Sequence, residues 1–154
     1  MKILKRAQNL VAQYGTSDAA TIMASIGIEI AYIPMTNLRG IYNCIEKMPF
    51  VAINSNLTDC ERKFVEAHEL AHYILHRGVN RVFLNRTTYL KTDHYEREAD
   101  LFAACMRAPW PNDVLFEGEP VDNLAARLGV RREVAEMYLN EVCGNCLLYT
   151  SPSP

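Results

Sequence analysis

The sequence lacks any long hydrophobic run. Its longest apolar stretches, such as residues 26–34, fall far below the roughly 18 residues that a membrane span requires. The start of the chain also lacks the basic and then apolar pattern of a secretory signal. We therefore expect a cytoplasmic protein that does not use a membrane.

The chain also has no excess of charge of one sign and no paired set of cysteines. Sixteen Lys and Arg residues stand against eighteen Asp and Glu residues, which disfavours a protein that binds nucleic acid by charge alone. Five cysteines, an odd number, do not fit the disulfide framework of a small secreted domain. Free thiols in a reducing compartment are the simpler interpretation.

The length and composition indicate one compact domain, because the chain has 154 residues and 49% of them are hydrophobic. We place this domain at residues 1–145. From Cys146 the sequence CLLYTSPSP has no helical or strand period. It resembles the translation of an adapter used in preparing sequencing libraries, so we expect residues 146–154 to be a non-native tail without a chemical role.

The first third of the domain predicts two helices followed by a small sheet. Apolar residues recur at helical spacing over residues 2–14, and a second short helix follows a cap at Ser17 or Asp18 and ends at Gly27. Three β-rich runs come next, and their short connections favour a small antiparallel meander. These runs are residues 28–33, 40–45 and 50–53.

The rest of the domain predicts helices, which makes the fold class α+β. Thr58 and Glu61 form a capping-box pattern that starts a helix, and Gly78 ends it. Residues 79–91 have no clear period and favour a loop. The next helix is expected to start at Thr92 or Asp93 and to end before Pro109, and a C-terminal helix pair is expected over residues 121–128 and 131–142.

The segment HELAH at residues 68–72 fits the pattern H-E-x-x-H within the helix that follows Thr58. Two histidines four residues apart project from one helix face, so His68 and His72 can bind one metal ion. Glu69 then lies beside the open coordination position, where it could take a proton from a water molecule that attacks a carbonyl group. Chance produces this pattern about 0.01 times in such a chain, so we favour a hydrolytic zinc site over two packed histidines.

A catalytic zinc ion usually has three protein ligands, and in this kind of site the third is a carboxylate on a later helix. Glu96 and Glu98 are both candidates, but they lie about 160° apart around the helix axis and cannot both face one metal ion. We select Glu96, because it shares a small, apolar face with Ala99 and Phe102. Asp100 could accept the second ring N–H of a ligating histidine and fix its orientation.

Taken together, these motifs resemble the ImmA/IrrE family of metallopeptidase-like proteins. The resemblance is carried by HELAH with the following YILH, and by the pattern E-x-x-A-x-x-F-A that runs from Glu96 towards Pro109. It covers most of residues 1–142, including the strand FVAIN at residues 50–54. One departure is Ala71, which stands where the family commonly has glycine.

The resemblance implies a zincin-like α+β domain, a minimal version of the thermolysin architecture. It implies that His68, His72 and Glu96 hold Zn²⁺ or another divalent metal ion, with Glu69 as the general base. It also implies a protein substrate, typically a helix-turn-helix repressor that controls a mobile element or a stress regulon. The expected protein is therefore a zinc-dependent endopeptidase that cleaves such a repressor.

The C-terminal helix pair offers a different function. LAARLGV at residues 124–130 resembles the first helix and turn of a helix-turn-helix, and Arg131 and Arg132 stand where a recognition helix would begin. Three glutamates further along that helix would repel DNA phosphates, and helix hairpins often only close a core. Direct DNA binding is therefore the weaker prediction.

A third alternative keeps the metal site without proteolysis. The protein would then sequester its repressor partner by binding it, and residue types do not separate this from cleavage. The sequence also leaves the oxyanion donor open, with His76, His94 and Tyr95 as candidates by proximity.

Overall fold

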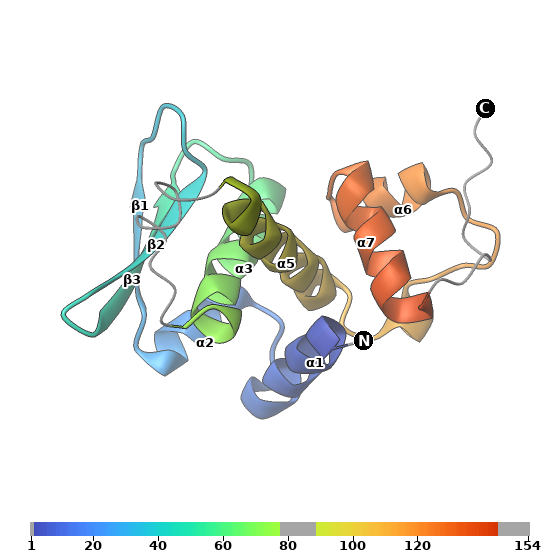
Figure 1. The fold of residues 1–154 in the computed structure, drawn as a ribbon, viewed down its shortest axis with the longest axis horizontal. Helices are drawn as coiled ribbons and strands as arrows, with labels where there is room; N and C mark the ends of the chain where they lie inside the picture. Colours follow the sequence, from blue (N-terminus) through green and yellow to red (C-terminus); the bar gives the residue numbers. More distant parts are fainter. Residues whose placement is uncertain (1, 78–88, 145–154) are drawn as a thin grey trace.

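A computed structural model describes residues 2–77 and 89–144 of the chain. Over these ranges the predicted α+β class is confirmed: two helices lead into a three-stranded sheet, and further helices follow (Figure 1). The elements are α1 (Lys2–Tyr14), α2 (Ala19–Ile26), β1 (Glu29–Ile33), β2 (Gly40–Ile45), β3 (Met48–Asn54), α3 (Asp59–Leu75), α5 (Tyr89–Arg107), the 3-10 helix η1 (Pro111–Asp113), α6 (Val121–Leu128) and α7 (Arg132–Cys143).

The sheet has the strand order β1-β3-β2, so the antiparallel meander expected from the sequence is wrong. The strand β2 pairs antiparallel with β3, but β1 pairs with β3 in parallel, with Glu29 opposite Phe50. The strand β3 takes the centre because it is the most buried strand, with Val51 and Ile53 fully inaccessible to solvent. The strand β2 is left at an edge of the sheet.

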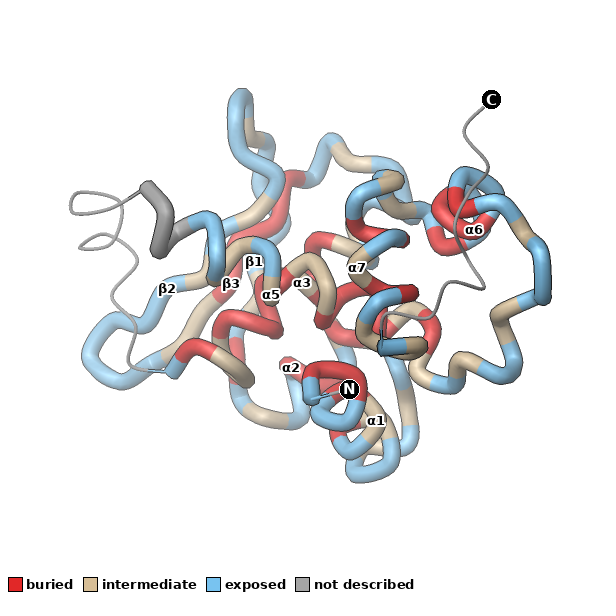
Figure 2. Tube along the Cα trace, turned by 45° about the vertical axis from the view of Figure 1, so that its right-hand side comes forward, coloured by how far each residue is buried: buried red, intermediate tan, exposed pale blue. Residues whose placement is uncertain are grey.

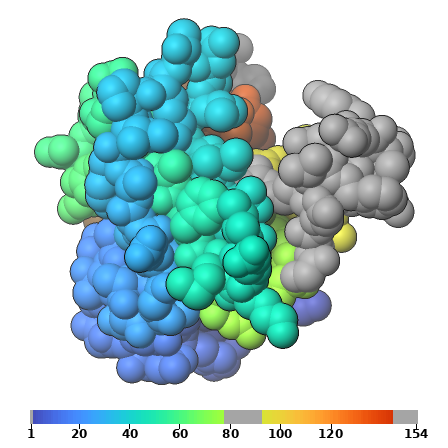
Figure 3. All heavy atoms as spheres, turned by 90° about the vertical axis from the view of Figure 1, so that its left-hand side faces the viewer, coloured from blue at the N-terminus to red at the C-terminus, as the bar shows by residue number. Residues whose placement is uncertain are grey.

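The two faces of the sheet differ in what covers them. Val51 and Ile53 point into the core between the sheet and the helices. The opposite face carries Ile41, Ile45 and Met48, all of them exposed, because side chains alternate along each strand. Figure 3 looks onto the side of the molecule formed by the strands, with the N-terminal helices below them.

The helix α3 begins as the sequence predicts. Thr58 Oγ1 accepts a hydrogen bond from the Glu61 backbone N–H, and the Glu61 carboxylate accepts one from the Thr58 N–H. This reciprocal pair satisfies two N–H groups that a helix start otherwise leaves unpaired. The helix ends at Leu75, with His76 as its C-terminal cap, so it stops before Gly78, which lies outside the described residues.

The helix α5 lies beside α3 and begins earlier than expected, at Tyr89 rather than at Thr92 or Asp93 (Figure 1). Of the loop predicted at residues 79–91, the part up to residue 88 lies outside the described residues and the rest is helical. Ala99 and Ala103 of α5 are buried and share a helix face with Glu96, which reaches α3, and their small size suits the close approach of the two helices. Figure 2 shows the burial concentrated where these helices meet.

The C-terminal helix pair has the predicted form, with Gly129 in the left-handed conformation at the end of α6. Tyr138 of α7 is fully buried, and its hydroxyl donates a hydrogen bond to the Ala108 carbonyl oxygen at 2.7 Å. This contact ties α7 to the end of α5. The expected tail from Cys146 lies outside the described residues, so the boundary of the domain stays a prediction.

Candidate metal centre

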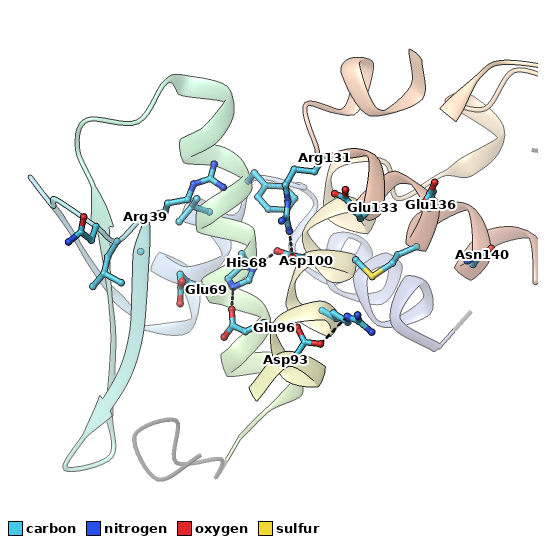
Figure 4. A pocket seen from close by; sticks show the side chains of 17 residues that line it. Arg39, His68, Glu69, Asp93, Glu96, Asp100, Arg131, Glu133, Glu136 and Asn140 are labelled. Carbon is cyan, nitrogen blue, oxygen red and sulfur yellow. Dashed lines mark hydrogen bonds and ion pairs between the residues drawn. The ribbon is translucent and has the colours of Figure 1, made fainter. Parts of the chain in front are cut away.

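Three side chains converge between α3 and α5. His68 and His72 lie one turn apart on α3, and Glu96 reaches them from α5. Figure 4 shows His68 and Glu96 facing each other. His68 Nε2 lies 2.9 Å from Glu96 Oε2, and His72 Nε2 lies 3.4 Å from Glu96 Oε1. One ligand atom from each residue fits within 4.8 Å of the other two, a spacing that one cation could bridge.

Glu98, the competing candidate, lies elsewhere. Its Oε1 atom is 2.7 Å from His94 Nε2 and 3.7 Å from His76 Nε2. The two glutamates therefore face different groups, as their angular separation on the helix predicts. The structure brings Glu96, and not Glu98, to the two histidines of the H-E-x-x-H segment.

Asp100 contacts the far side of the His68 ring. Its Oδ1 atom lies 2.8 Å from His68 Nδ1, and its Oδ2 atom accepts a hydrogen bond from Arg131 Nη2 at 3.0 Å. When the proton of His68 is on Nδ1, this N–H donates a hydrogen bond to Asp100. The lone pair of Nε2 is then directed towards Glu96 and His72. The sequence suggested the contact of Asp100 with a ligating histidine. It did not indicate the contact with Arg131, which the weaker DNA-binding alternative placed at the start of a recognition helix.

His76 has a corresponding position behind His72. Its Nδ1 atom lies 3.1 Å from His72 Nδ1, and its ring packs edge-on against Tyr95 at a centroid distance of 4.7 Å. His94 has an exposed side chain and pairs with Glu98. Among the described residues that line the cavity at the site, none is His76, His94 or Tyr95, so the structure does not favour any of them as the oxyanion donor.

A cavity of about 780 Å³ opens beside His68 and Glu96, while His72 lies buried behind them and does not line it. Glu69 lines it while remaining only 3% exposed, and the connection between β1 and β2 and one face of α7 form its walls. Gly40 of β2 lies against α3 so closely that a Cβ atom there would be 2.7 Å from Val65 Cγ1 and 3.2 Å from Glu69 Cγ. The sheet edge therefore packs directly on the turn of α3 that carries Glu69.

The electrostatics of the donors depend on their mutual contacts. Burial alone would lower the pKa of His68, but the hydrogen bonds with Asp100 and Glu96 outweigh it and raise this pKa to about 9. Burial would raise the pKa of Glu96, but its hydrogen bonds with His68 and His72 hold it well below its usual range. The contacts among these donors therefore favour the protonated form of His68 and the ionised form of Glu96.

This donor set fits a divalent metal ion. Two imidazole nitrogens and one carboxylate are the ligands that a catalytic zinc ion takes, and a fourth position on the side of the cavity would remain open. The contacts of Asp100 and His76 with the far ring nitrogens are those expected of groups that orient ligating histidines.

Comparison with known proteins identifies the family. The model of the peptidase M78 family, described as the IrrE N-terminal-like domain, matches residues 23–140, so the chain belongs to this family. The match confirms the ImmA/IrrE resemblance of the sequence motifs. Membership places the chain among peptidases.

Two relatives share most of their length with this chain. It is 33% identical over 135 residues to the uncharacterized immunity region protein 2 of Bacillus phage phi105, covering 84% of each chain. It is 25% identical over 146 residues to the metallopeptidase ImmA of Bacillus subtilis (strain 168), covering 91% of this chain and 85% of the relative.

No helix among the described residues is long and apolar enough to cross a membrane.

Proposed function

We propose that this protein is a zinc-dependent endopeptidase that cleaves a helix-turn-helix transcriptional repressor in the cytoplasm. The observation that carries the proposal is the convergence of His68, His72 and Glu96, in a chain of a peptidase family, where two of these donors, His68 and Glu96, line a cavity together with Glu69. These are the parts that metal-assisted hydrolysis of a peptide bond requires.

In this proposal His68, His72 and Glu96 hold the zinc ion. A bound zinc ion would supply a Lewis acid that polarises the scissile carbonyl group and makes water easier to deprotonate. The donor atoms belong to two rigid, packed helices, which keeps their separation fixed before the ion binds.

Glu69 acts as the general base. Its carboxylate accepts a proton from the attacking water molecule and later delivers it to the leaving amine. Burial to 3% exposure favours proton exchange with a group in the cavity over exchange with bulk water. Val65 and Gly40 pack beside this side chain and restrict its movement.

A repressor is the proposed substrate for two reasons. The phage relative is named for an immunity region, and the family resemblance implies a repressor that controls a mobile element. The cavity is bordered by β2, an edge strand, and an extended peptide can add to such an edge through its backbone. Cleavage would occur in a segment that is extended or locally unfolded.

The contacts of the C-terminal helices support a protein substrate over DNA. Arg131 pairs with Asp100, and Arg132 pairs with Asp122 and Glu136 at 2.9 and 3.0 Å. Arginines that are neutralised by carboxylates of their own chain are poor phosphate ligands. Direct DNA binding therefore stays the weaker alternative.

The test compares the unmodified protein with Glu69→Gln on a purified repressor encoded beside its gene. We expect cleavage by the unmodified protein, a loss of at least about 100-fold in Glu69→Gln, and equal zinc content in both proteins. Glu117→Gln changes an exposed carboxylate that does not line the cavity; this variant serves as the matched control and should cleave normally.

Two results would contradict the proposal. Equal cleavage by Glu69→Gln would remove the general base from the mechanism. Tight binding of the repressor by both proteins, without any cleavage and with zinc present, would instead establish sequestration as the working mode.

A further inference from the structure

We propose that Arg131 is a positioning residue that holds the metal-ligating side chain of His68 in place through Asp100. The inference rests on the proposed zinc site but not on proteolysis. It assigns to Arg131 a role in the site, in place of the DNA contact that its position at the start of a helix suggested.

The contacts form a continuous line from the surface to the donor cluster. Arg131 Nη2 lies 3.0 Å from Asp100 Oδ2, and Asp100 Oδ1 lies 2.8 Å from His68 Nδ1 (Figure 4). His68 Nε2 in turn lies 2.9 Å from Glu96 Oε2. Both oxygens of the Asp100 carboxylate are thus engaged, so this carboxylate cannot rotate without losing a partner on one side.

The turn that carries Arg131 is itself fixed against the helices of the site. Arg107, at the end of α5, donates hydrogen bonds to the Leu128 carbonyl oxygen and to Cys60 Sγ, both at 3.0 Å. Gly129 lies so close to Cys60, in the first turn of α3, that a Cβ atom would overlap its sulfur. The α6–α7 turn is therefore docked on both α3 and α5, which carry His68 and Asp100.

A role of Arg131 through its charge and a role through the orientation of Asp100 predict opposite changes in metal affinity when Arg131 is removed. A cation near the site repels a divalent metal ion, so a role through charge alone predicts that removal of Arg131 tightens metal binding. A role through the orientation of Asp100 predicts that the removal weakens metal binding. The sign of the change therefore separates the two roles.

The adjacent arginine provides a matched control. Arg132 has the same charge and its side chain is 41% exposed, against 69% for Arg131, but it pairs with Asp122 and Glu136 and not with Asp100. The replacements Arg131→Ala and Arg132→Ala therefore remove the same groups from neighbouring positions, and only the first removes a contact of Asp100.

The experiment measures zinc affinity by competition with a chromophoric chelator, using the full chain and zinc alone. We expect Arg131→Ala to bind zinc about three- to tenfold more weakly than the unmodified protein, and Arg131→Lys to recover part of the loss. Arg132→Ala should stay within about twofold, since neither of its carboxylate partners, Asp122 and Glu136, contacts a proposed metal ligand. Thermal unfolding of the metal-free proteins should give equal midpoints for the two alanine variants.

A double-mutant cycle tests the route through Asp100. Asp100→Asn alone should weaken zinc binding by about 10- to 100-fold. Adding Arg131→Ala to Asp100→Asn should then cost much less than it costs alone, because the two side chains act in series.

The inference is overturned if Arg131→Ala binds zinc as tightly as the unmodified protein or more tightly. It is also overturned if Arg132→Ala shows the same loss, or if the losses of the double mutant simply add. Failure of the proposed cleavage is a separate result, because a chain that binds zinc without cutting its repressor still allows this comparison.

Discussion

His68 is the residue whose protonation connects the candidate site to pH. Its hydrogen bonds with Asp100 and Glu96 raise its pKa to about 9, despite the opposing effect of burial. A histidine binds a metal ion only in its neutral form, so a cation at this site must displace the proton of His68 at neutral pH. Glu96 is already ionised and releases no proton.

We therefore expect zinc affinity to rise with pH by up to tenfold per unit between about pH 7 and 8.5. The sign follows from the raised pKa of His68: below about 9 the proton competes with the metal ion, and the competition weakens as pH increases. Chelator competition across this range, corrected for the protonation of the chelator, measures the slope. A flat profile would show that His68 is neutral in the metal-free protein or is not a ligand.

At the scale of single residues, the sequence predicted those features of the site that follow from helix geometry alone. The spacing of His68 and His72 and the shared face of Glu96 with apolar residues follow from 3.6 residues per turn, so the donor set could be selected over Glu98. The contact of Arg131 with Asp100 joins positions 31 residues apart through the packing of separate helices. No local pattern encodes such a contact.

The edge strand β2 packs against α3, the helix that carries the H-E-x-x-H segment. Gly40 contacts Val65 and Glu69 without room for a side chain. We expect Gly40→Ala to lower the free energy of unfolding by about 1–3 kcal/mol, because the added methyl group forces β2 away from α3. Denaturant unfolding measures the loss.

The companion variant Val65→Ala checks the cause. Removing the two Val65 methyl groups opens the space that a Cβ at position 40 would need, so Gly40→Ala should cost less in the Val65→Ala background. An equal cost in both backgrounds would attribute the loss to backbone flexibility instead of to this contact.

The N-terminus of helix α1 is capped by a side chain of α7, which lies near the other end of the sequence. Glu141 of α7 accepts hydrogen bonds from the backbone N–H groups of Ile3 at 2.8 Å and Leu4 at 3.1 Å. The first turn of a helix leaves its N–H groups unpaired, and a carboxylate there also interacts favourably with the helix dipole. Burial alone would raise the pKa of Glu141, but these hydrogen bonds lower it.

Glu141→Ala should therefore reduce the free energy of unfolding by about 1–2 kcal/mol at neutral pH. Because the folded-state pKa of Glu141 is lowered, its contribution is complete above about pH 5 and is lost as pH falls below about 4. Thermal unfolding at several pH values should show the two proteins converging in acid. Glu117→Ala, an exposed glutamate outside the helices, should change stability by less than about 0.5 kcal/mol.

The sequence predicted the individual helices and strands better than it predicted how the strands pair. The capping box at Thr58 and the helix pair around Gly129 have local signatures, and both are confirmed. The strand order is not local, since it depends on which strand buries most surface, and the meander prediction failed for that reason. The start of α5 at Tyr89 was missed because residues 79–91 have no clear hydrophobic period.

At the scale of the whole molecule, α7 joins the sheet-and-helix unit of the site to the N-terminal helix. It contacts α5 and α1 and contributes one wall of the cavity, and its N-cap residue, Arg131, reaches Asp100. The C-terminal helix pair is therefore an integral part of the candidate site. A change in how α7 docks would alter the cavity and the donors together.

We expect the last residues to add nothing to this unit. A chain truncated after Asn145 should match the full chain in zinc content and in the midpoint of thermal unfolding, because residues 146–154 are predicted to be a non-native tail. Calorimetry and elemental analysis of both chains provide the comparison. A lower midpoint after truncation would show that the tail belongs to the domain.

The central claim is that His68, His72 and Glu96 hold one metal ion. Elemental mass spectrometry of the purified protein and of His72→Ala, Glu96→Gln and Glu98→Gln tests it most directly. We predict about one zinc ion per chain, lost in the first two variants and retained in the third, which alters a carboxylate outside the donor cluster. A folded chain that binds no metal when zinc is plentiful, or a loss of zinc in Glu98→Gln with retention in Glu96→Gln, would contradict the account.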